Sequence, residues 1–268
     1  MTHKIDINVK SNGQLIAQYP FFTHDPTQDV WVSGVMHRDA TWEVSETAIF
    51  MDAIKDAKCI VDAGANIGWY SVLAGHVNPN AVIHSFEPFS QNFSLLERNV
   101  SSAPNLSRIH LNRKALSNKT GSMQLTLTDT TNFGDFQLSP NGVEREAPVS
   151  EIVETITLDD YLQGQNVDVL KIDTQGSEHF IFEGFQNSFS AQTKKPVIFV
   201  EYWPLQLCKN GVDLNHFFKH LEGYDVYAIS RNTTTMTLQK IGELVEDGMR
   251  CIEASHRGFW DLVCFSKQ

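Results

Sequence analysis

The chain has 268 residues, of which 41% are hydrophobic and 20% are charged, and these values are typical of a folded globular protein rather than a disordered one. Its 32 Asp and Glu residues outnumber 21 Lys and Arg residues, which gives a net charge of −11. Because such a charge repels polyanions, nucleic acid is not an expected partner.

The amino terminus and the cysteines indicate the cellular compartment. The first residues, Met-Thr-His-Lys-Ile-Asp-Ile-Asn, lack the apolar segment of a signal peptide, and no apolar run approaches the roughly 18 residues that span a bilayer. The four cysteines show no Cys-x-x-Cys spacing, and Cys59 and Cys264 fall in apolar runs that suggest buried strands. We therefore expect a reduced, cytoplasmic protein without membrane insertion.

Residues 1–57 are expected to form an extension in front of the main domain. Within it, the apolar spacing of residues 41–57 predicts a leading helix. We expect this helix to pack beside the first strand of the domain.

From residue 58 to residue 268, short apolar runs alternate with longer helical patterns, which is typical of βαβ units in an α/β fold. The predicted strands are 59–63, 82–87, 109–112, 167–172, 197–201, 225–230 and 259–265. The predicted helices are 68–76, 91–100, 157–162, 177–184 and 215–221. Ser90 is expected to cap the second of these helices. Residues 117–157 have an alternating, turn-rich pattern, which predicts a hairpin and loop insertion.

A glycine-rich turn follows the first predicted strand, with the sequence Asp-Ala-Gly-Ala-Asn-Ile-Gly at positions 62–68. Gly64 and Gly68 allow the backbone to approach a ligand, because glycine has no Cβ and tolerates positive φ. The free N–H groups at the start of the next helix favour a ligand carboxylate or phosphate. Asp62 is suited to accept hydrogen bonds from an ammonium or hydroxyl group.

Glu87 lies at the end of the second strand, 23 residues after Gly64. From this position an acid reaches the ribose hydroxyls of an adenosine ligand. An NAD-dependent oxidoreductase shares both features, but its G-x-G-x-x-G motif requires a glycine where this chain has Asn66. A catalytically silent nucleoside-binding module of the same fold is the other alternative.

Six motifs occur in order along the chain: D-A-G-A-N-I-G at 62–68, S-F-E-P at 85–88, K-A-L-S at 114–117, T-L-D at 157–159, K-I-D-T-Q-G-S-E at 171–178 and F-V-E at 199–201. The ordered set resembles the FkbM family of S-adenosylmethionine-dependent methyltransferases, over roughly residues 42–201. The chain departs from several family members at Gln175, where they have Glu in a Val-Glu-Gly motif.

The resemblance implies a class I, Rossmann-like methyltransferase fold. Its sheet has seven strands, mostly parallel with the last one antiparallel, and helices on both faces. The implied activity is O-methylation of a hydroxyl on a sugar, lipid or polyketide-like molecule, or on a glycan. S-adenosylmethionine is the implied cofactor and S-adenosylhomocysteine the product. The implied cofactor-binding residues are Glu43, Asp62, Gly64, Ala65, Asn66, Gly68, Glu87, Pro88, Lys114, Ala115 and Asp173.

Methyl transfer to a hydroxyl requires a base within hydrogen-bond reach of the acceptor oxygen. Asp173 and Glu201 are the catalytic candidates because they lie at strand ends, and Glu178 and His179 are weaker ones. His179 is expected on a helix surface, and Lys171 is expected either to pair with Asp173 or to contact substrate. The carboxylates also suit Mg²⁺, but their spacing is not diagnostic, so no metal site is predicted and Mg²⁺ stays an alternative.

Aromatic residues near these motifs have two alternative roles, lining an acceptor pocket beside the sulfonium or packing in the core. They are Trp42, Trp69, Tyr70, Tyr202 and Trp203. No motif identifies the acceptor, whose specificity is expected to lie in residues 117–157 and in the two terminal regions.

Overall fold

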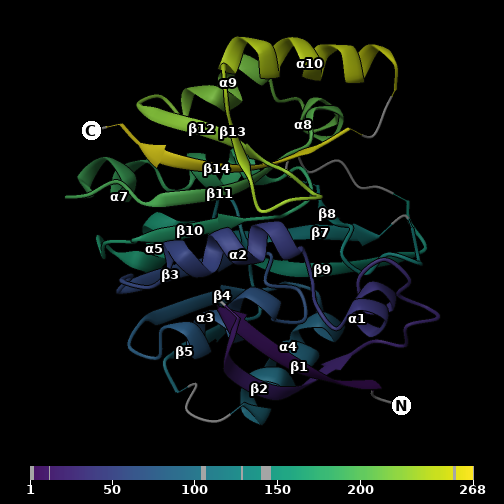
Figure 1. Cartoon of the computed structure of the whole chain (residues 1–268). Helices are drawn as coiled ribbons and strands as arrows, with labels where there is room; N and C mark the ends of the chain where they lie inside the picture. Colours follow the sequence, from purple (N-terminus) through teal and green to yellow (C-terminus); the bar gives the residue numbers. More distant parts are fainter. Residues whose placement is uncertain are drawn as a thin grey trace.

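The computed structural model describes residues 3–11, 13–103, 107–127, 129–139, 146–255 and 258–267, and within these a large central sheet has eight strands. They are β3 (Cys59–Ala63), β4 (Val82–Phe86), β5 (Ile109–Asn112), β10 (Val169–Ile172), β11 (Val197–Tyr202), β12 (Tyr224–Ile229), β13 (Met236–Gln239) and β14 (Trp260–Ser266). Their order is β13-β12-β14-β11-β10-β3-β4-β5 (Figure 1). The strands from β11 to β5 pair in parallel, whereas β14 runs antiparallel between β11 and β12.

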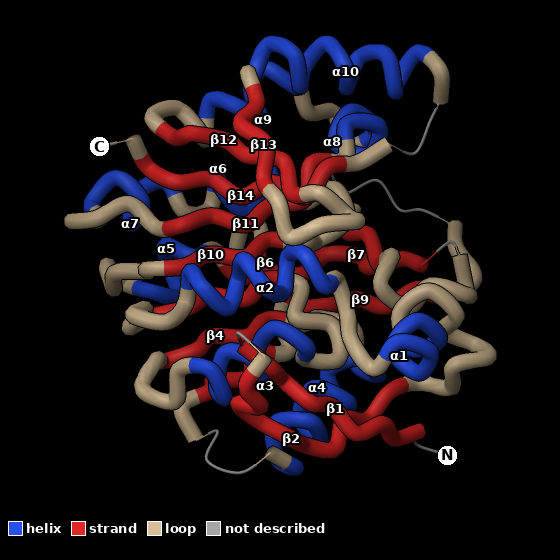
Figure 2. Tube along the Cα trace, in the orientation of Figure 1, coloured by secondary structure: helices blue, strands red, loops and turns tan. Residues whose placement is uncertain are grey.

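Helices cover both faces of this sheet (Figure 2). One face carries α2 (Val44–Ala53), α3 (Trp69–Val77) and α4 (Ser90–Ser102). The other carries α5 (Leu158–Leu162), α6 (Glu178–Glu183), α7 (Gln186–Ala191), α8 (Pro204–Lys209), α9 (Leu214–Lys219) and α10 (Ile241–Glu253). Because neighbouring strand residues point to opposite faces, Ile60 packs in the first core and Val61 in the second. Strands that are buried on both sides explain the uninterrupted apolar runs of the sequence.

An antiparallel hairpin, β1 (His3–Ser11) and β2 (Gln14–Thr23), begins the described chain and packs against α3 and α4. Figure 1 shows it in purple, at the opposite end of the molecule from α10. The Asn99 side chain of α4 accepts a hydrogen bond from the Phe22 N–H (2.6 Å) and donates one to the Phe22 carbonyl (2.9 Å). The short helix α1 (Ser33–Asp39) follows. The sequence patterns predicted neither the hairpin nor α1, whereas α2 lies where the leading helix was expected.

A second, smaller sheet has the order β6-β9-β7-β8. Its strands are β6 (Ala115–Leu116), β7 (Gly121–Leu127), β8 (Phe136–Leu138) and β9 (Val149–Ile156). It occupies most of the predicted insertion at 117–157, of which residues 128 and 140–145 lie outside the described part. The division of the chain at residue 57 stays a prediction, and the extension shares one core with the main sheet through Ile7 and Phe21.

The predicted α/β class and the antiparallel last strand are confirmed. The sheet differs from the expected seven strands by β13, an additional edge strand that pairs only with β12 among the described residues. The helix α10 was not predicted either. Within the described residues, no helix is both long and apolar enough to cross a membrane.

Ser90 was expected to cap α4 from outside, and this prediction is wrong. Ser90 is the first residue of the helix, and Phe89 holds the cap position without a side-chain cap hydrogen bond. The Glu151 carboxylate of β9 accepts hydrogen bonds from both the Ser90 hydroxyl (3.0 Å) and the Ser90 N–H (3.3 Å). A charged acceptor on the neighbouring sheet therefore satisfies the first helical N–H in place of a capping serine.

Candidate functional site

A cavity of about 650 Å³ lies at the carboxyl ends of the central parallel strands. The residues that follow β3, β4 and β10 line it, among them Ala65, Glu87 and Asp173, and Glu201 contributes from the end of β11. In open α/β sheets, this edge is where ligands bind. The architecture therefore places the candidate site where the sequence motifs lie.

Most of the predicted site residues line this cavity. They are Glu43, Gly64, Ala65, Asn66, Glu87, Pro88, Lys114, Ala115, Asp173 and Glu201. Asp62 and Gly68 do not line it. The carboxylate of Asp62 is buried and accepts a hydrogen bond from the Ser71 hydroxyl (2.6 Å), and a Cβ on Gly68 would lie 2.7 Å from the Leu96 side chain. Asp62 and Gly68 thus contact protein groups that hold the turn in place. Their expected contact with a ligand stays a prediction.

Gly64 packs against protein backbone more closely than any other residue type allows. Its φ is +82°, and an added Cβ would lie 1.9 Å from the carbonyl oxygen of Asp173. The backbone N–H groups of Gly64 and Ala65 donate to the Phe86 carbonyl (3.0 and 2.9 Å). The glycine therefore lets the turns after β3 and β10 approach each other, rather than making room for a ligand alone.

The Glu87 side chain joins the turns after β3 and β4. One carboxylate oxygen accepts a hydrogen bond from the Asn66 N–H (2.9 Å), and the other accepts one from the Phe89 N–H (2.9 Å). Burial raises the pKa of Glu87 to about 7, although these two hydrogen bonds oppose the shift. Each carboxylate oxygen has a second lone pair, so the group retains the capacity to accept further hydrogen bonds.

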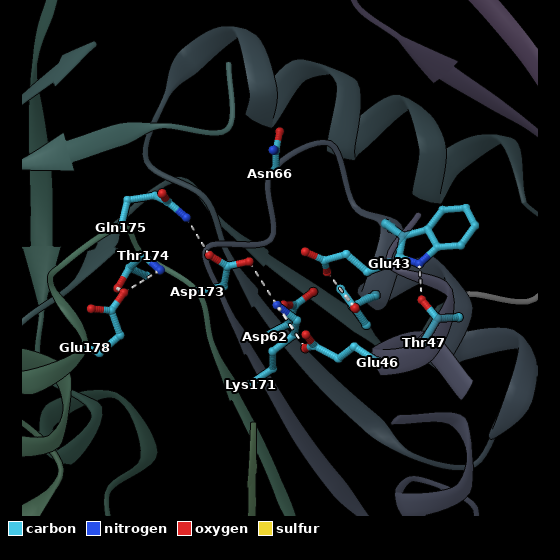
Figure 3. Close-up of polar contacts among 12 residues, drawn as sticks. Glu43, Glu46, Thr47, Asp62, Asn66, Lys171, Asp173, Thr174, Gln175 and Glu178 are labelled. Atoms are coloured by element: carbon cyan, nitrogen blue, oxygen red, sulfur yellow. Dashed lines mark hydrogen bonds and ion pairs between the residues drawn. The ribbon is translucent and has the colours of Figure 1, made fainter. Parts of the chain in front are cut away.

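A buried lysine organises the acidic floor of the cavity (Figure 3). The Lys171 ammonium lies 3.2 Å from the Asp173 carboxylate, 3.6 Å from that of Glu46 and 4.3 Å from the centre of the Tyr70 ring. Tyr70 donates a hydrogen bond to Glu43 (2.7 Å). Burial alone would lower the pKa of Lys171, but the surrounding carboxylates outweigh it and raise that pKa well above its usual value.

Both carboxylate oxygens of Asp173 accept hydrogen bonds from neighbouring side chains. Its second carboxylate oxygen accepts a hydrogen bond from the Gln175 amide (2.8 Å), as Figure 3 shows. Gln175 has a φ of +56°, an uncommon conformation for a residue with a side chain. Because Glu cannot donate this hydrogen bond, the departure from the family motif at position 175 adds a donor to Asp173.

Glu178 and His179 lie outside the cavity lining. Glu178 accepts hydrogen bonds from the N–H groups of Thr174 (2.9 Å) and Gly176 (3.1 Å), so it closes the turn after β10. The expectation of a surface histidine is wrong: His179 is buried, 3.2 Å from a ring nitrogen of His220. The rings of His216 in α9 and of His220, which follows α9, both lie 4.9 Å from the His179 ring, and nothing in the local sequence indicates these contacts.

The described residues contain no group of three or more His, Cys, Asp or Glu side chains that could hold a metal ion. The carboxylates that were considered for Mg²⁺ are distributed differently. Asp173 is bound by Lys171 and Gln175, while Glu178 closes a backbone turn. Glu178 Oε2 and Glu201 Oε2 have no hydrogen-bond partner among the described residues, and Mg²⁺ stays an untested alternative.

Four of the five aromatic candidates, Trp42, Trp69, Tyr70 and Trp203, line the cavity. Tyr202 does not, because its ring packs in the core on the other side of the sheet, and its hydroxyl donates to the Leu244 carbonyl (3.3 Å).

The roof of the cavity was not predicted residue by residue. The buried Asp29 carboxylate of the extension accepts hydrogen bonds from the Ser33 N–H (2.9 Å) and from the Phe133 N–H of the insertion (3.0 Å). Val32, Phe133 and the C-terminal Asp261 also line the cavity. The insertion and both terminal regions thus line the cavity, although no spacing rule connects segments so far apart, and their role in acceptor specificity stays a prediction.

The family model for the methyltransferase FkbM domain matches residues 62–237, which is most of the chain and includes the cavity-lining motifs. The chain belongs to the FkbM methyltransferase family. The FkbM match also extends past residue 201, where the sequence motifs end, to include β12 and the start of β13.

One curated relative in this comparison is "Methyltransferase 1" of Beauveria bassiana (strain ARSEF 2860). It is 26% identical over 150 residues, which are 49% of this chain and 60% of that protein. The chain thus matches less than two thirds of the relative's length.

Two solved structures illustrate the structural similarity. Methyltransferase FkbM from Methylobacillus flagellatus KT has a TM-score of 0.49 and 16% identity, over 78% of this chain and 44% of that one. TYW2 from M. jannaschii, solved in complex with AdoMet, has a TM-score of 0.44 and 11% identity, over 97% of this chain and 84% of that one.

Proposed function

We propose that this FkbM family member transfers a methyl group from S-adenosylmethionine to a hydroxyl of a sugar, lipid or polyketide-like acceptor. The observation that carries the proposal is the buried Glu87 carboxylate, fixed by two backbone N–H groups at the cavity wall. Its remaining lone pairs suit the two ribose hydroxyls of the cofactor, which are paired donors.

Unpartnered polar atoms in the cavity support a polar organic ligand. Among the described residues, Asn66 Oδ1, Glu201 Oε2 and Trp203 Nε1 are buried without a hydrogen-bond partner, and all three residues line the cavity. Leaving such atoms unsatisfied costs about 1–3 kcal/mol each, so a bound ligand that satisfies them gains affinity.

The charge of the cavity favours a cationic cofactor and disfavours an anionic acceptor. Eight acidic residues line it, against Lys114, Lys171 and Arg231. The sulfonium of S-adenosylmethionine is attracted both by these carboxylates and by the face of an aromatic ring such as Trp42. The same charge disfavours nucleic acid, and it disfavours the pyrophosphate that an NAD-dependent oxidoreductase must bind.

Loss of the Glu87 charge should weaken cofactor binding. We expect Glu87→Gln to weaken the affinity for S-adenosylmethionine and S-adenosylhomocysteine by about 10- to 100-fold, because one charged hydrogen-bond acceptor is lost. Calorimetric titration with both compounds and with NAD measures this. Glu97→Gln, at an exposed carboxylate of α4 outside the cavity lining, is the matched control. Binding of NAD alone would favour the oxidoreductase, and cofactor binding without transfer to any hydroxyl compound would favour the silent module.

Cofactor affinity should fall as the pH drops below about 7. Burial raises the pKa of Glu87 to about 7, and the ionised form is the one that accepts two hydroxyl hydrogen bonds. Below that pH, binding must release the Glu87 proton, so affinity decreases up to about tenfold per pH unit. Titrations with the neutral S-adenosylhomocysteine between about pH 5.5 and 8 test this, and Glu87→Gln should flatten the profile. A wild-type profile without a slope in this range would contradict it.

A further inference from the structure

Two of the unpartnered buried atoms belong to one short segment at the end of β11. Glu201 is 8% exposed and Trp203 is 7% exposed, and both line the cavity. Tyr202, between them, faces the core on the opposite side of the sheet. Glu201 of β11 and Trp203, which directly follows β11 at the start of α8, are therefore both presented to the cavity.

The two atoms have complementary chemistry. Trp203 Nε1–H is only a donor, and a Glu201 carboxylate is only an acceptor. A hydroxyl group both accepts and donates a hydrogen bond, so it can satisfy the two at once. An ether oxygen, the product of methylation, can satisfy only the donor.

From this pairing, which rests on the proposed function, we propose that Glu201 accepts the proton of the acceptor hydroxyl while Trp203 donates a hydrogen bond to its oxygen. The acceptor oxygen forms the new C–O bond as the C–S bond of the cofactor breaks, and the hydroxyl proton passes to Glu201. The cofactor loses its positive charge in this step, and Glu201 loses its negative charge.

Asp173 is less suited to this role because both of its oxygens are engaged. Lys171 holds one at 3.2 Å, and the Gln175 amide holds the other at 2.8 Å. Glu201 Oε2, by contrast, is buried without a hydrogen-bond partner and is available to the acceptor hydroxyl. Of the two catalytic candidates, Glu201 is therefore the base.

The groups around Glu201 favour proton transfer from the acceptor hydroxyl to Glu201 over the reverse transfer. Burial first, and then the carboxylates of Asp173, Glu178, Asp261 and Glu43, raise the pKa of Glu201 well above its usual value. The cations on this side are Lys171, which pairs with Asp173, and Arg231, which lies 3.7 Å from Asp261. A cationic cofactor favours the ionised carboxylate, which is the base. The neutral thioether product favours the protonated form, so the proton stays on Glu201 after transfer.

Counting protons during cofactor binding tests the assignment of the base without an acceptor. Calorimetry in buffers of different ionisation enthalpy gives the number of protons released by S-adenosylmethionine and by S-adenosylhomocysteine. At neutral pH, we expect the cationic compound to release more protons, by up to about one. Protons released through Glu87 cancel in this comparison, because both compounds have the same ribose.

Glu201→Gln should remove most of this excess, whereas Tyr202→Phe should retain it. An equal proton release by the two compounds, or an excess that persists in Glu201→Gln, would overturn the assignment. If neither compound binds, the proposed function itself has failed, so the two failures are distinguishable.

The role of Trp203 is tested by a crystal structure of the complex with S-adenosylhomocysteine. We expect an ordered water in place of the acceptor hydroxyl, within about 3.2 Å of both Trp203 Nε1 and a Glu201 carboxylate oxygen. In Trp203→Phe this water should be lost or displaced, while the excess proton release stays. A wild-type complex in which Trp203 Nε1 bonds to the cofactor or to another protein group would refute the role.

Discussion

Replacing Lys171 with Met should destabilise the protein by about 3–5 kcal/mol at neutral pH. The ammonium is 5% exposed and lies within 3.6 Å of the carboxylates of Asp173 and Glu46, so its removal leaves buried negative charges without a counter-ion. Met has a similar length, and thus the loss reflects charge more than volume. Urea denaturation measures the change in the free energy of unfolding.

The pH dependence of this loss distinguishes an electrostatic cause from a packing defect. Without Lys171, the pKa values of the buried carboxyls rise further in the folded state, so folding then binds protons and stability falls as the pH rises. The destabilisation should be smaller at about pH 5 than at about pH 8. Lys4→Met, which removes an exposed ion pair with Asp6 (3.1 Å), should cost less than about 1 kcal/mol at either pH. An equal loss at both pH values in Lys171→Met would indicate packing instead.

The sequence could predict most of the central sheet because its inner strands are buried on both faces. The predicted strand 59–63 is buried throughout and coincides with β3 at both ends, and the predicted strand 109–112 coincides with the edge strand β5. The residues that follow those runs then lie at one edge of the sheet by topology alone, so Glu87 and Asp173 could be assigned to a single site before any contact was known.

The elements that were missed depend on tertiary contacts rather than on local pattern. The hairpin has polar residues on its outer face, and Tyr19 and Phe21 become core residues only against α3 and α4. Likewise, β13 is an edge strand with a mostly exposed sequence. Hydrophobic periodicity and intrinsic strand propensity are weak signals for such segments.

Within the site, the sequence indicated which residue types gather but not which contacts they make. Glu46 was not singled out, although it completes the surroundings of Lys171 from α2. The carboxylate of Asp62 accepts a hydrogen bond from Ser71, which the sequence did not indicate, and its contact with a ligand stays a prediction. Both outcomes depend on how α2 and α3 pack over the sheet, which no motif encodes. Only their hydrogen-bond partners distinguish Asp173 from Glu201 as bases. Asp173 accepts hydrogen bonds at both carboxylate oxygens, whereas one carboxylate oxygen of Glu201 has no partner.

A methyl group at position 64 should be among the most damaging single changes in the chain. In Gly64→Ala, the Cβ would lie 1.9 Å from the Asp173 carbonyl oxygen and 2.9 Å from its carbonyl carbon. These are backbone atoms, so no side-chain rotation relieves the overlap, and the positive φ adds about 1–2 kcal/mol. We expect a total loss above about 4 kcal/mol in the free energy of unfolding, measured by urea denaturation.

Gly121→Ala is the matched control for this change. Gly121 begins β7, and an added Cβ there would meet no atom within 4 Å, so we expect a change below about 1 kcal/mol. If Gly64→Ala does fold, the turns after β3 and β10 must have separated. Asp173 would then move away from Gln175 and Lys171, and cofactor affinity would fall together with stability. A Gly64→Ala protein with wild-type stability would mean that the two turns do not approach as closely as this structure has them.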